Sequence, residues 1–151
     1  MNTIEIDKKL DKVEGFLGAF PFDQIPKSKK NLFSLVINTS SSHGVGDHWL
    51  SLVYKDNIFY FLDSYGRNFT NLTFSEEFKS TIKKYIGNKK CMYNKKLLQQ
   101  LTSNTCGEYA IYFVYMLSSN TSLKNSLKPF RDSLKYNDDY ITRLITKNSL
   151  I

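Results

Sequence analysis

The sequence has few of the residues that cross-link or anchor a protein: two cysteines, two histidines, three prolines and one tryptophan among 151 residues. Two cysteines allow at most one disulfide, which excludes the disulfide-rich class of small secreted proteins. The longest apolar run, residues 109–117, is about half as long as a membrane-spanning helix. The first twenty residues interleave charged and apolar side chains, unlike a signal peptide. We therefore expect a protein that is not secreted and has no membrane partner.

Acidic residues are also few, with 14 Asp and Glu against 21 Lys and Arg and a net charge of +7. Lysine carries most of the positive charge, and many lysines lie in the middle of the chain with tyrosines between them. A solvated lysine-rich surface is the simpler interpretation, and sequence-independent DNA binding that is accessory to another function is the alternative. The candidate DNA-binding residues are Lys83, Lys84, Lys89, Lys90, Lys95 and Lys96.

The hydrophobic content of 41% is enough for a packed core, and we expect residues 1–151 to form one α+β domain. Apolar spacing and capping residues predict surface helices, and runs of β-branched and aromatic residues predict strands. The predicted helices are one with apolar positions from Ile6 to Leu17, which Gly15 and Gly18 are expected to end, one over 74–86 behind a capping box of Thr73 and Glu76, and one that begins at Asn137. The predicted strands include 31–40 and 89–98.

One histidine and one aspartate stand near the two ends of a predicted β-hairpin, "HWLSLVYKDNIFYFLDSY". Asp56-Asn57 is a two-residue connection of the kind that closes a tight hairpin, and the resulting register pairs His48 with Tyr65. Because side chains alternate with a period of two, Asp63 becomes the diagonal neighbour of His48 on the same face. Such a carboxylate would fix the imidazole tautomer and stabilise the imidazolium. The alternative is that His48 merely begins a strand beside a buried Trp49 and that Asp63 is a turn residue.

Cys106 stands where the polar segment "QQLTSNT" changes into an apolar stretch that we expect to be a buried helix over residues 106–117. The N–H groups at a helix N-terminus favour a thiolate, and a nearby His48 would make that thiolate an activated nucleophile. Gly107 allows close approach of the backbone. An amide from Gln99 or Gln100, together with the N–H of Cys106, would form an oxyanion hole. The alternative for Cys106 is a small apolar core residue.

The other cysteine and the other histidine have no comparable partners in the sequence. Cys91 follows several lysines and has no base of its own, so we interpret it as structural, with a reactive or disulfide-forming role as the alternative. His43 lies in a loop rich in glycine and serine and is expected to be exposed.

Four features in this order, "GDHW", "YFLDSYG", a glutamine and "SNTCGEYAIYF", resemble the adenovirus protease (adenain) family of cysteine peptidases, which includes maturation proteases of virophages and Polinton-type elements. The resemblance spans most of residues 16–117. It implies a papain-like architecture with circularly permuted order (His, Asp, Gln, Cys), a central mixed or antiparallel sheet flanked by helices, and a buried helix that starts at the catalytic cysteine. The implied roles are His48 as general base, Asp63 as its orienting acid where adenovirus enzymes have Glu, Gln99 as oxyanion donor with Gln100 as the alternative, Cys106 as nucleophile, and Trp49 and Gly107 beside the substrate.

The resemblance also implies a function, the cleavage of capsid and core precursor proteins during virus maturation. We expect a monomeric enzyme in the virion and in the cytoplasm, virus factory or nucleus of the infected cell, with chemistry that needs no metal or other cofactor. Adenovirus enzymes are activated by DNA and by a viral peptide, so both are candidate activators, although this chain is shorter after the catalytic helix. The alternatives are a deubiquitinase-like or deSUMOylase-like peptidase of the same clan, which would need a broad cleft, and a non-catalytic nucleic-acid-binding protein.

Overall fold

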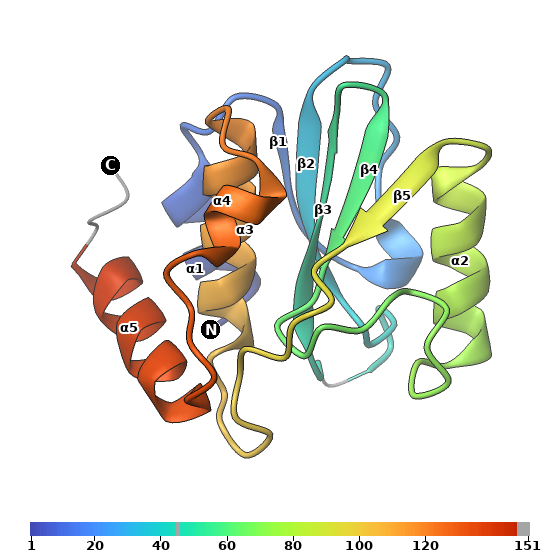
Figure 1. Cartoon of the computed structure of the whole chain (residues 1–151). Coiled ribbons are helices and arrows are strands. Elements are labelled where there is room, and N and C mark those ends of the chain that lie inside the picture. The colour runs from blue at the N-terminus through green and yellow to red at the C-terminus, as the bar shows by residue number, and fades with distance from the viewer. Residues whose placement is uncertain (45, 148–151) are drawn as a thin grey trace.

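A five-stranded mixed sheet carries helices on both faces in the computed structural model, which describes residues 1–44 and 46–147 (Figure 1). The strand order is β1-β2-β3-β4-β5, with antiparallel pairs at the centre and a parallel pair at each edge. The elements are α1 (Thr3–Leu10), β1 (Phe16–Pro21), η1 (Phe22–Gln24), β2 (Phe33–Asn38), β3 (Trp49–Lys55), β4 (Ile58–Leu62), α2 (Glu76–Ile86), β5 (Lys90–Tyr93), α3 (Cys106–Ser118), α4 (Leu123–Leu127) and α5 (Leu134–Thr146). The predicted α+β class, a mixed sheet flanked by helices, is confirmed.

The hydrophobic core is divided by the sheet into two layers, because side chains alternate between its faces. Val36 and Val53 belong to the layer that contains α3, whereas Leu50 and Leu52 belong to the layer that contains α2. Figure 1 shows α1, α3, α4 and α5 on one side of the sheet and α2 with η1 on the other. Helix α3 is buried on most sides because the sheet, α1, α4 and α5 all contact it, so the predicted buried helix is confirmed.

The β3–β4 hairpin closes through the two residues that the sequence predicts. Asp56 and Asn57 have φ values of 52° and 64°, the left-handed conformation that a tight hairpin turn requires and that these two residue types tolerate. Lys55 pairs with Ile58, as the predicted register requires. Strand β4 ends one residue before Asp63, at the end of the hairpin where β3 begins.

The loops that carry the candidate site lie at this end of the strands. β2 ends here and β3 begins here, and β5 ends beside β4 because the two strands are parallel. Figure 1 shows the segment that follows β5 running from this end of the strands to the N-terminal end of α3, whereas the segment that follows β4 leads to α2. Residues from three separate loops therefore meet the first turn of α3, which begins at Cys106.

The first helix is shorter than predicted, and an unpredicted strand follows it. Helix α1 ends at Leu10, whereas Leu17, which the apolar spacing assigns to the same helix, lies in β1. Gly15 has a φ of 78°, and a Cβ added there would lie 2.5 Å from the carbonyl oxygen of Leu32, so the chain turns where only glycine fits. Ile6 and Leu10 lie on the buried face of α1. The apolar residue at helical spacing beyond the turn, Leu17, belongs to β1 and matches the spacing by coincidence.

Two predicted helix caps are wrong for the same reason. Ser75, rather than Thr73, caps α2, so the capping box of Thr73 and Glu76 does not form. Ser133 caps α5, and Asn137 is a fully buried residue inside that helix. In each case several good capping residues stand close together in the sequence, and the packing of the apolar helix face on the core decides which of them is used.

The last strand is also shorter than its predicted range of 89–98. β5 covers Lys90–Tyr93, and the chain from 94 to 105 forms the loop that leads to α3. Within the described residues, no helix combines the length and the apolar character that crossing a membrane requires.

Candidate active site

His48, directly before β3, and Asp63, directly after β4, form a buried pair. Nε2 of His48 lies 2.6 Å from Oδ1 of Asp63, with 8% of the histidine and none of the aspartate exposed. The imidazole stacks on the ring of Tyr65, with 4.9 Å between centroids and 16° between planes. These contacts are those expected from the hairpin register, which pairs His48 with Tyr65 and makes Asp63 a diagonal neighbour. The catalytic roles of the two residues stay predictions.

Two residues that the sequence reasoning missed hold Asp63 in place. Arg67, four residues further on, donates its Nε to Oδ2 at 2.7 Å, so each carboxylate oxygen has a nitrogen partner. Asn94 accepts the backbone N–H of Asp63 at 2.9 Å and donates to its carbonyl at 2.6 Å. Burial raises the pKa of Asp63, but the hydrogen bonds with His48 and Arg67 outweigh it and hold the pKa below its ordinary value.

The thiol of Cys106 is the second partner of the imidazole. With Nε2 engaged by Asp63, Nδ1 of His48 is the ring nitrogen that remains for the sulfur. Burial by itself lowers the pKa of His48, but the hydrogen bonds with Asp63 and Cys106 outweigh it and raise the pKa to about 9. Burial raises the pKa of Cys106, whereas hydrogen bonds with His48 and the backbone of Trp49 bring it below the ordinary value. A thiolate beside an imidazolium is therefore favoured at neutral pH.

Of the two candidate glutamines, Gln99 is the one that borders the same hollow as Cys106 and His48. Its side chain is fully buried, and Nε2 donates to the carbonyl and hydroxyl oxygens of Ser103 at 3.0 and 3.1 Å. Gln100 contributes backbone groups instead: its N–H donates to Asp138 and its carbonyl accepts from Ser103. This placement favours Gln99 as the candidate oxyanion donor.

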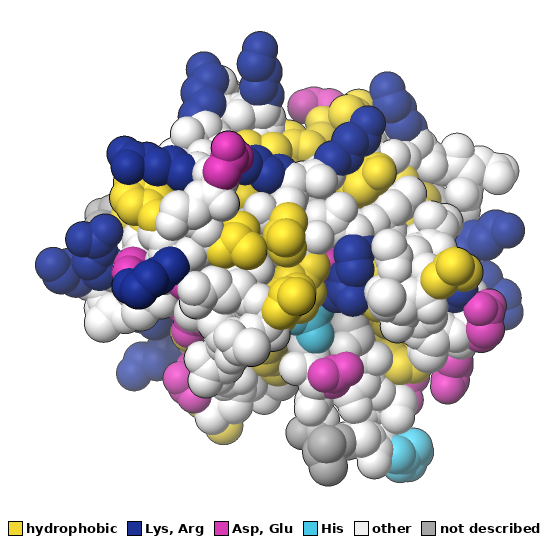
Figure 2. Space-filling model, turned by 60° about the horizontal axis from the view of Figure 1, so that its bottom comes forward, with side chains coloured by type: hydrophobic (Ala, Val, Ile, Leu, Met, Phe, Trp, Pro, Cys, Tyr) yellow, Lys and Arg dark blue, Asp and Glu magenta, His cyan; other side chains and the backbone are white. Residues whose placement is uncertain are grey.

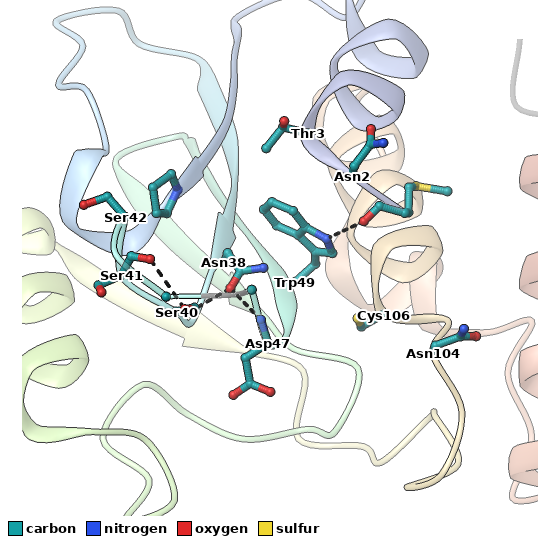
Figure 3. A pocket seen from close by; sticks show the side chains of 14 residues that line it. Asn2, Thr3, Asn38, Ser40, Ser41, Ser42, Asp47, Trp49, Asn104 and Cys106 are labelled. Carbon is teal, nitrogen blue, oxygen red and sulfur yellow. Dashed lines mark hydrogen bonds between the residues drawn. The ribbon is translucent and has the colours of Figure 1, made fainter.

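Two hollows are both bordered by Cys106. The first, of about 480 Å³, is bordered by the segment from Ser40 to Ser42, by Trp49 and by the first residues of the chain. Figure 3 shows the Ser40–Ser42 segment across this hollow from Trp49 and Cys106. The second, of about 520 Å³, is bordered by His48, Tyr65 and Arg67 among other residues. An extended chain that occupied both hollows would therefore lie beside Cys106.

Trp49 and Gly107, the two predicted neighbours of the substrate, both contact the start of the chain. Nε1 of Trp49 donates to the carbonyl of Met1 at 3.0 Å (Figure 3). A Cβ added to Gly107 would lie 3.1 Å from the Cβ of Met1, so glycine at this position leaves room for the Met1 side chain. Met1 thus forms one wall of the first hollow, beside the nucleophile candidate.

The remaining histidine and cysteine are separate from this site. His48 is buried and His43 is exposed. Figure 2 shows histidine side chains in cyan, one recessed beside hydrophobic side chains and one projecting from the surface. Cys91 is half-buried in β5, and burial raises its pKa to about 11, which argues against a reactive role. Among residues 1–44 and 46–147, no three His, Cys, Asp or Glu side chains gather as metal ligands.

The predicted DNA-binding lysines lie on α2, on β5 and on the segments that flank β5. Lys96 differs from the others because it is half-buried and donates to the carbonyl of Phe130 at 3.2 Å. Lys89 borders a hollow of about 310 Å³ together with three lysines that the prediction missed. These three are Lys27, Lys29 and Lys30.

Comparison with known proteins gives a match at the level of the fold. No family model matches the sequence, and no curated protein is similar enough to be matched. Two crystal structures of the ASFV pS273R protease match 96% and 94% of this chain at TM-scores of 0.61 and 0.57, each with 16% identity. The chain spans 65% and 66% of that protease, slightly less than two thirds. The central domain of the uncharacterized Lpg1148 protein from Legionella pneumophila matches all of this chain, and 98% of that domain is covered, at a TM-score of 0.55 and 10% identity. This chain therefore shares its mixed α+β fold with a viral protease.

Proposed function

We propose that this protein is a cysteine endopeptidase that cleaves capsid or core precursor proteins during virus maturation, as a relative of the adenovirus protease family. The observation that carries the proposal is the position of Cys106 at the start of α3, bordering one hollow together with His48, which lowers the pKa of the thiol, and with Gln99. The shared fold with the ASFV protease supports the proposal, and so do the two hollows that Cys106 borders.

In the proposed reaction, the Cys106 thiolate attacks the carbonyl carbon of the peptide, a C–S bond forms, and the carbonyl electron pair moves onto the oxygen. The N–H of Cys106 donates to this oxyanion, and so does one N–H of Gln99, which gives up its bond to the Ser103 hydroxyl, while the second Gln99 N–H keeps its bond to the Ser103 carbonyl. The C–N bond breaks as His48 gives its proton to the leaving amine. Water then attacks the thioester, His48 accepts a proton from it, and the acid product leaves as the C–S bond breaks.

Asp63 acts on this reaction through the imidazole. Its carboxylate, bound at Nε2, keeps Nδ1 of His48 directed at the sulfur and stabilises the imidazolium. Arg67 shares the carboxylate, so Asp63 remains ionised although it is fully buried. No metal or organic cofactor takes part in these steps, and DNA or a viral peptide would act only as an activator. We further propose a monomer that works in the virion and the infected cell.

The experiment that tests the function is incubation with the capsid precursor encoded with the protein, followed by mass spectrometry of the products. We expect wild type and the matched control Cys91→Ala to cleave the precursor, and Cys106→Ala to leave it intact. Cleavage by Cys106→Ala would show that the nucleophile is another group. Cleavage of ubiquitin or SUMO fusions, with the capsid precursor left intact, would replace virus maturation by modifier removal.

A further inference from the structure

The amide of Gln99 is held at both ends by serine residues from different parts of the chain. Ser64, which directly follows Asp63, donates its hydroxyl to Oε1 at 2.5 Å, and its carbonyl accepts the backbone N–H of Gln99 at 3.2 Å. At the other end, both Ser103 acceptors contact Nε2. Only 2% of Ser64 is exposed, so water has little access to compete for these bonds.

The contacts continue from Ser103 to a buried carboxylate on the C-terminal helix. The hydroxyl of Ser103 lies 3.1 Å from Oγ1 of Thr105, and Thr105 donates to Oδ1 of Asp138 at 3.1 Å. Asp138 is 6% exposed and also accepts from the hydroxyl of Tyr109 at 2.8 Å and from the N–H of Gln100 at 3.2 Å. Asp138 on α5 thus binds the loop 99–105 at two points and the first turns of α3 at a third.

The direction of the Gln99 amide follows from these partners. A carboxylate such as Asp138 only accepts, so the Thr105 hydroxyl donates to it. The Ser103 hydroxyl donates its one proton to the Gln100 carbonyl, so toward Gln99 it can only accept. The Ser103 carbonyl also only accepts, and a flipped amide would set Oε1 against it at about the 3.0 Å now found for Nε2. The N–H groups of Gln99 are therefore kept toward Ser103, which borders the hollow that contains Cys106.

We propose that Ser64 and Asp138 are positioning residues of the oxyanion hole, which hold the Gln99 amide and its loop in place for the reaction at Cys106. The inference rests on the proposed function, because only acyl transfer develops an oxyanion. Asp63 and Ser64 are consecutive, so one short segment after β4 orients both the base and the oxyanion donor. Helix α5, outside the segment that carries the family resemblance, thereby contributes to the site.

The test compares two reactions of Cys106, of which only one needs the oxyanion hole. Acylation by p-nitrophenyl acetate passes through an oxyanion before nitrophenolate leaves, whereas alkylation by iodoacetamide displaces iodide without one. For Ser64→Ala and Asp138→Asn we expect the acylation rate constant to fall roughly tenfold, less than the 10²–10³-fold typical of deleting a donor. The alkylation rate constant should stay within about twofold, because the thiolate and its imidazolium are retained.

Gln99→Ala and Ser34→Ala are the matched controls. Gln99→Ala sets the full effect of losing the amide, and adding Ser64→Ala to it should cause no further loss, since coupled residues are not additive. Ser34 is also fully buried, but among residues 1–44 and 46–147 its hydroxyl has no hydrogen-bond partner, so Ser34→Ala should change neither rate. The proposal would be overturned if the acylation and alkylation rate constants fell together in Ser64→Ala and Asp138→Asn. It would also be overturned if neither rate constant changed in these variants.

Failure of the proposed function gives a different result. The wild-type protein could leave every peptide intact while Ser64→Ala and Asp138→Asn selectively lose acylation by the ester. The protein would then have the oxyanion hole without the peptidase activity. The ester reports on the hole directly, so this outcome removes the function and supports the positioning roles.

Discussion

Replacing Asp63 by asparagine keeps the shape of the side chain at the buried end of the imidazole and removes its charge. The pKa of His48 is about 9 against an ordinary value of 6.5, and its hydrogen bond with Asp63 is the largest of the contributions that raise it. A full return to the ordinary value would be about 2.5 pH units, or roughly 3 kcal/mol at about 1.4 kcal/mol per unit. Because Cys106 also raises this pKa, we expect Asp63→Asn to remove part of the shift, roughly one to two units.

The consequence is a smaller fraction of thiolate at neutral pH. Each unit by which the pKa of His48 falls shifts the equilibrium between the thiolate–imidazolium pair and the neutral pair tenfold toward the neutral form. The assay is the pH profile of Cys106 alkylation by iodoacetamide, in which the wild-type ion pair persists up to the pKa of His48, about 9. In Asp63→Asn this upper limit should move down, and alkylation at neutral pH should slow, by at most roughly 10- to 100-fold because the wild-type pair is already mostly thiolate. An unchanged profile would refute the electrostatic role of Asp63.

Three further predictions concern stability and binding. The pKa of Asp63 is lowered in the folded state, so its contribution to stability is present above pH 3.8 and is lost as the pH falls below that value. The free energy of unfolding measured in urea should therefore depend less on acid pH in Asp63→Asn than in wild type. Ser75→Ala should cost about 1 kcal/mol of unfolding free energy by loss of the α2 cap, and Thr73→Ala should cost less; equal costs would contradict the observed cap. Any DNA binding should weaken steeply with salt, and alanine substitution of contacting lysines should each reduce the salt slope by about 0.9; no binding at low salt would remove DNA as an activator. The lysines to substitute first are Lys27, Lys29, Lys30 and Lys89.

The parts of the site that could be predicted from the sequence depend on local information. The turn at Asp56-Asn57 and the two-residue alternation of the strands are enough to bring His48 beside Asp63. The change from a polar segment to an apolar helix is likewise enough to place Cys106 at a helix start. Each of these inferences needs only a few neighbouring residues, so the packing of the rest of the chain does not alter them.

The residues that support the site could not be predicted, because their partners are far apart in the sequence. Ser64 and Gln99 are separated by 35 residues, and Gln100 and Asp138 by 38. Serine, asparagine and aspartate are frequent in this chain, and a sequence pattern does not show which of them the fold will bring together. Strand β1 was missed for a related reason, since its partner β2 is parallel and the register is set by contacts between separate segments.

Arg67 is the supporting residue for which the sequence offered a signal. It lies four residues after Asp63 and follows a glycine with a φ of 74°, which reverses the chain and returns the guanidinium to the carboxylate. A cation placed one turn after a buried carboxylate could have been proposed as its partner before the structure was known.

The central claim is that Cys106 is an activated nucleophile, and the most direct test is to label both cysteines of the native protein with limiting iodoacetamide. Peptide mass spectrometry then gives the alkylation rate of each, with Cys91 as the control inside the same molecule. Because the pKa of Cys106 is lowered and that of Cys91 is about 11, Cys106 should react at neutral pH while Cys91 remains unmodified. Equal labelling of the two cysteines, or labelling of Cys106 only in strongly alkaline buffer, would contradict the account.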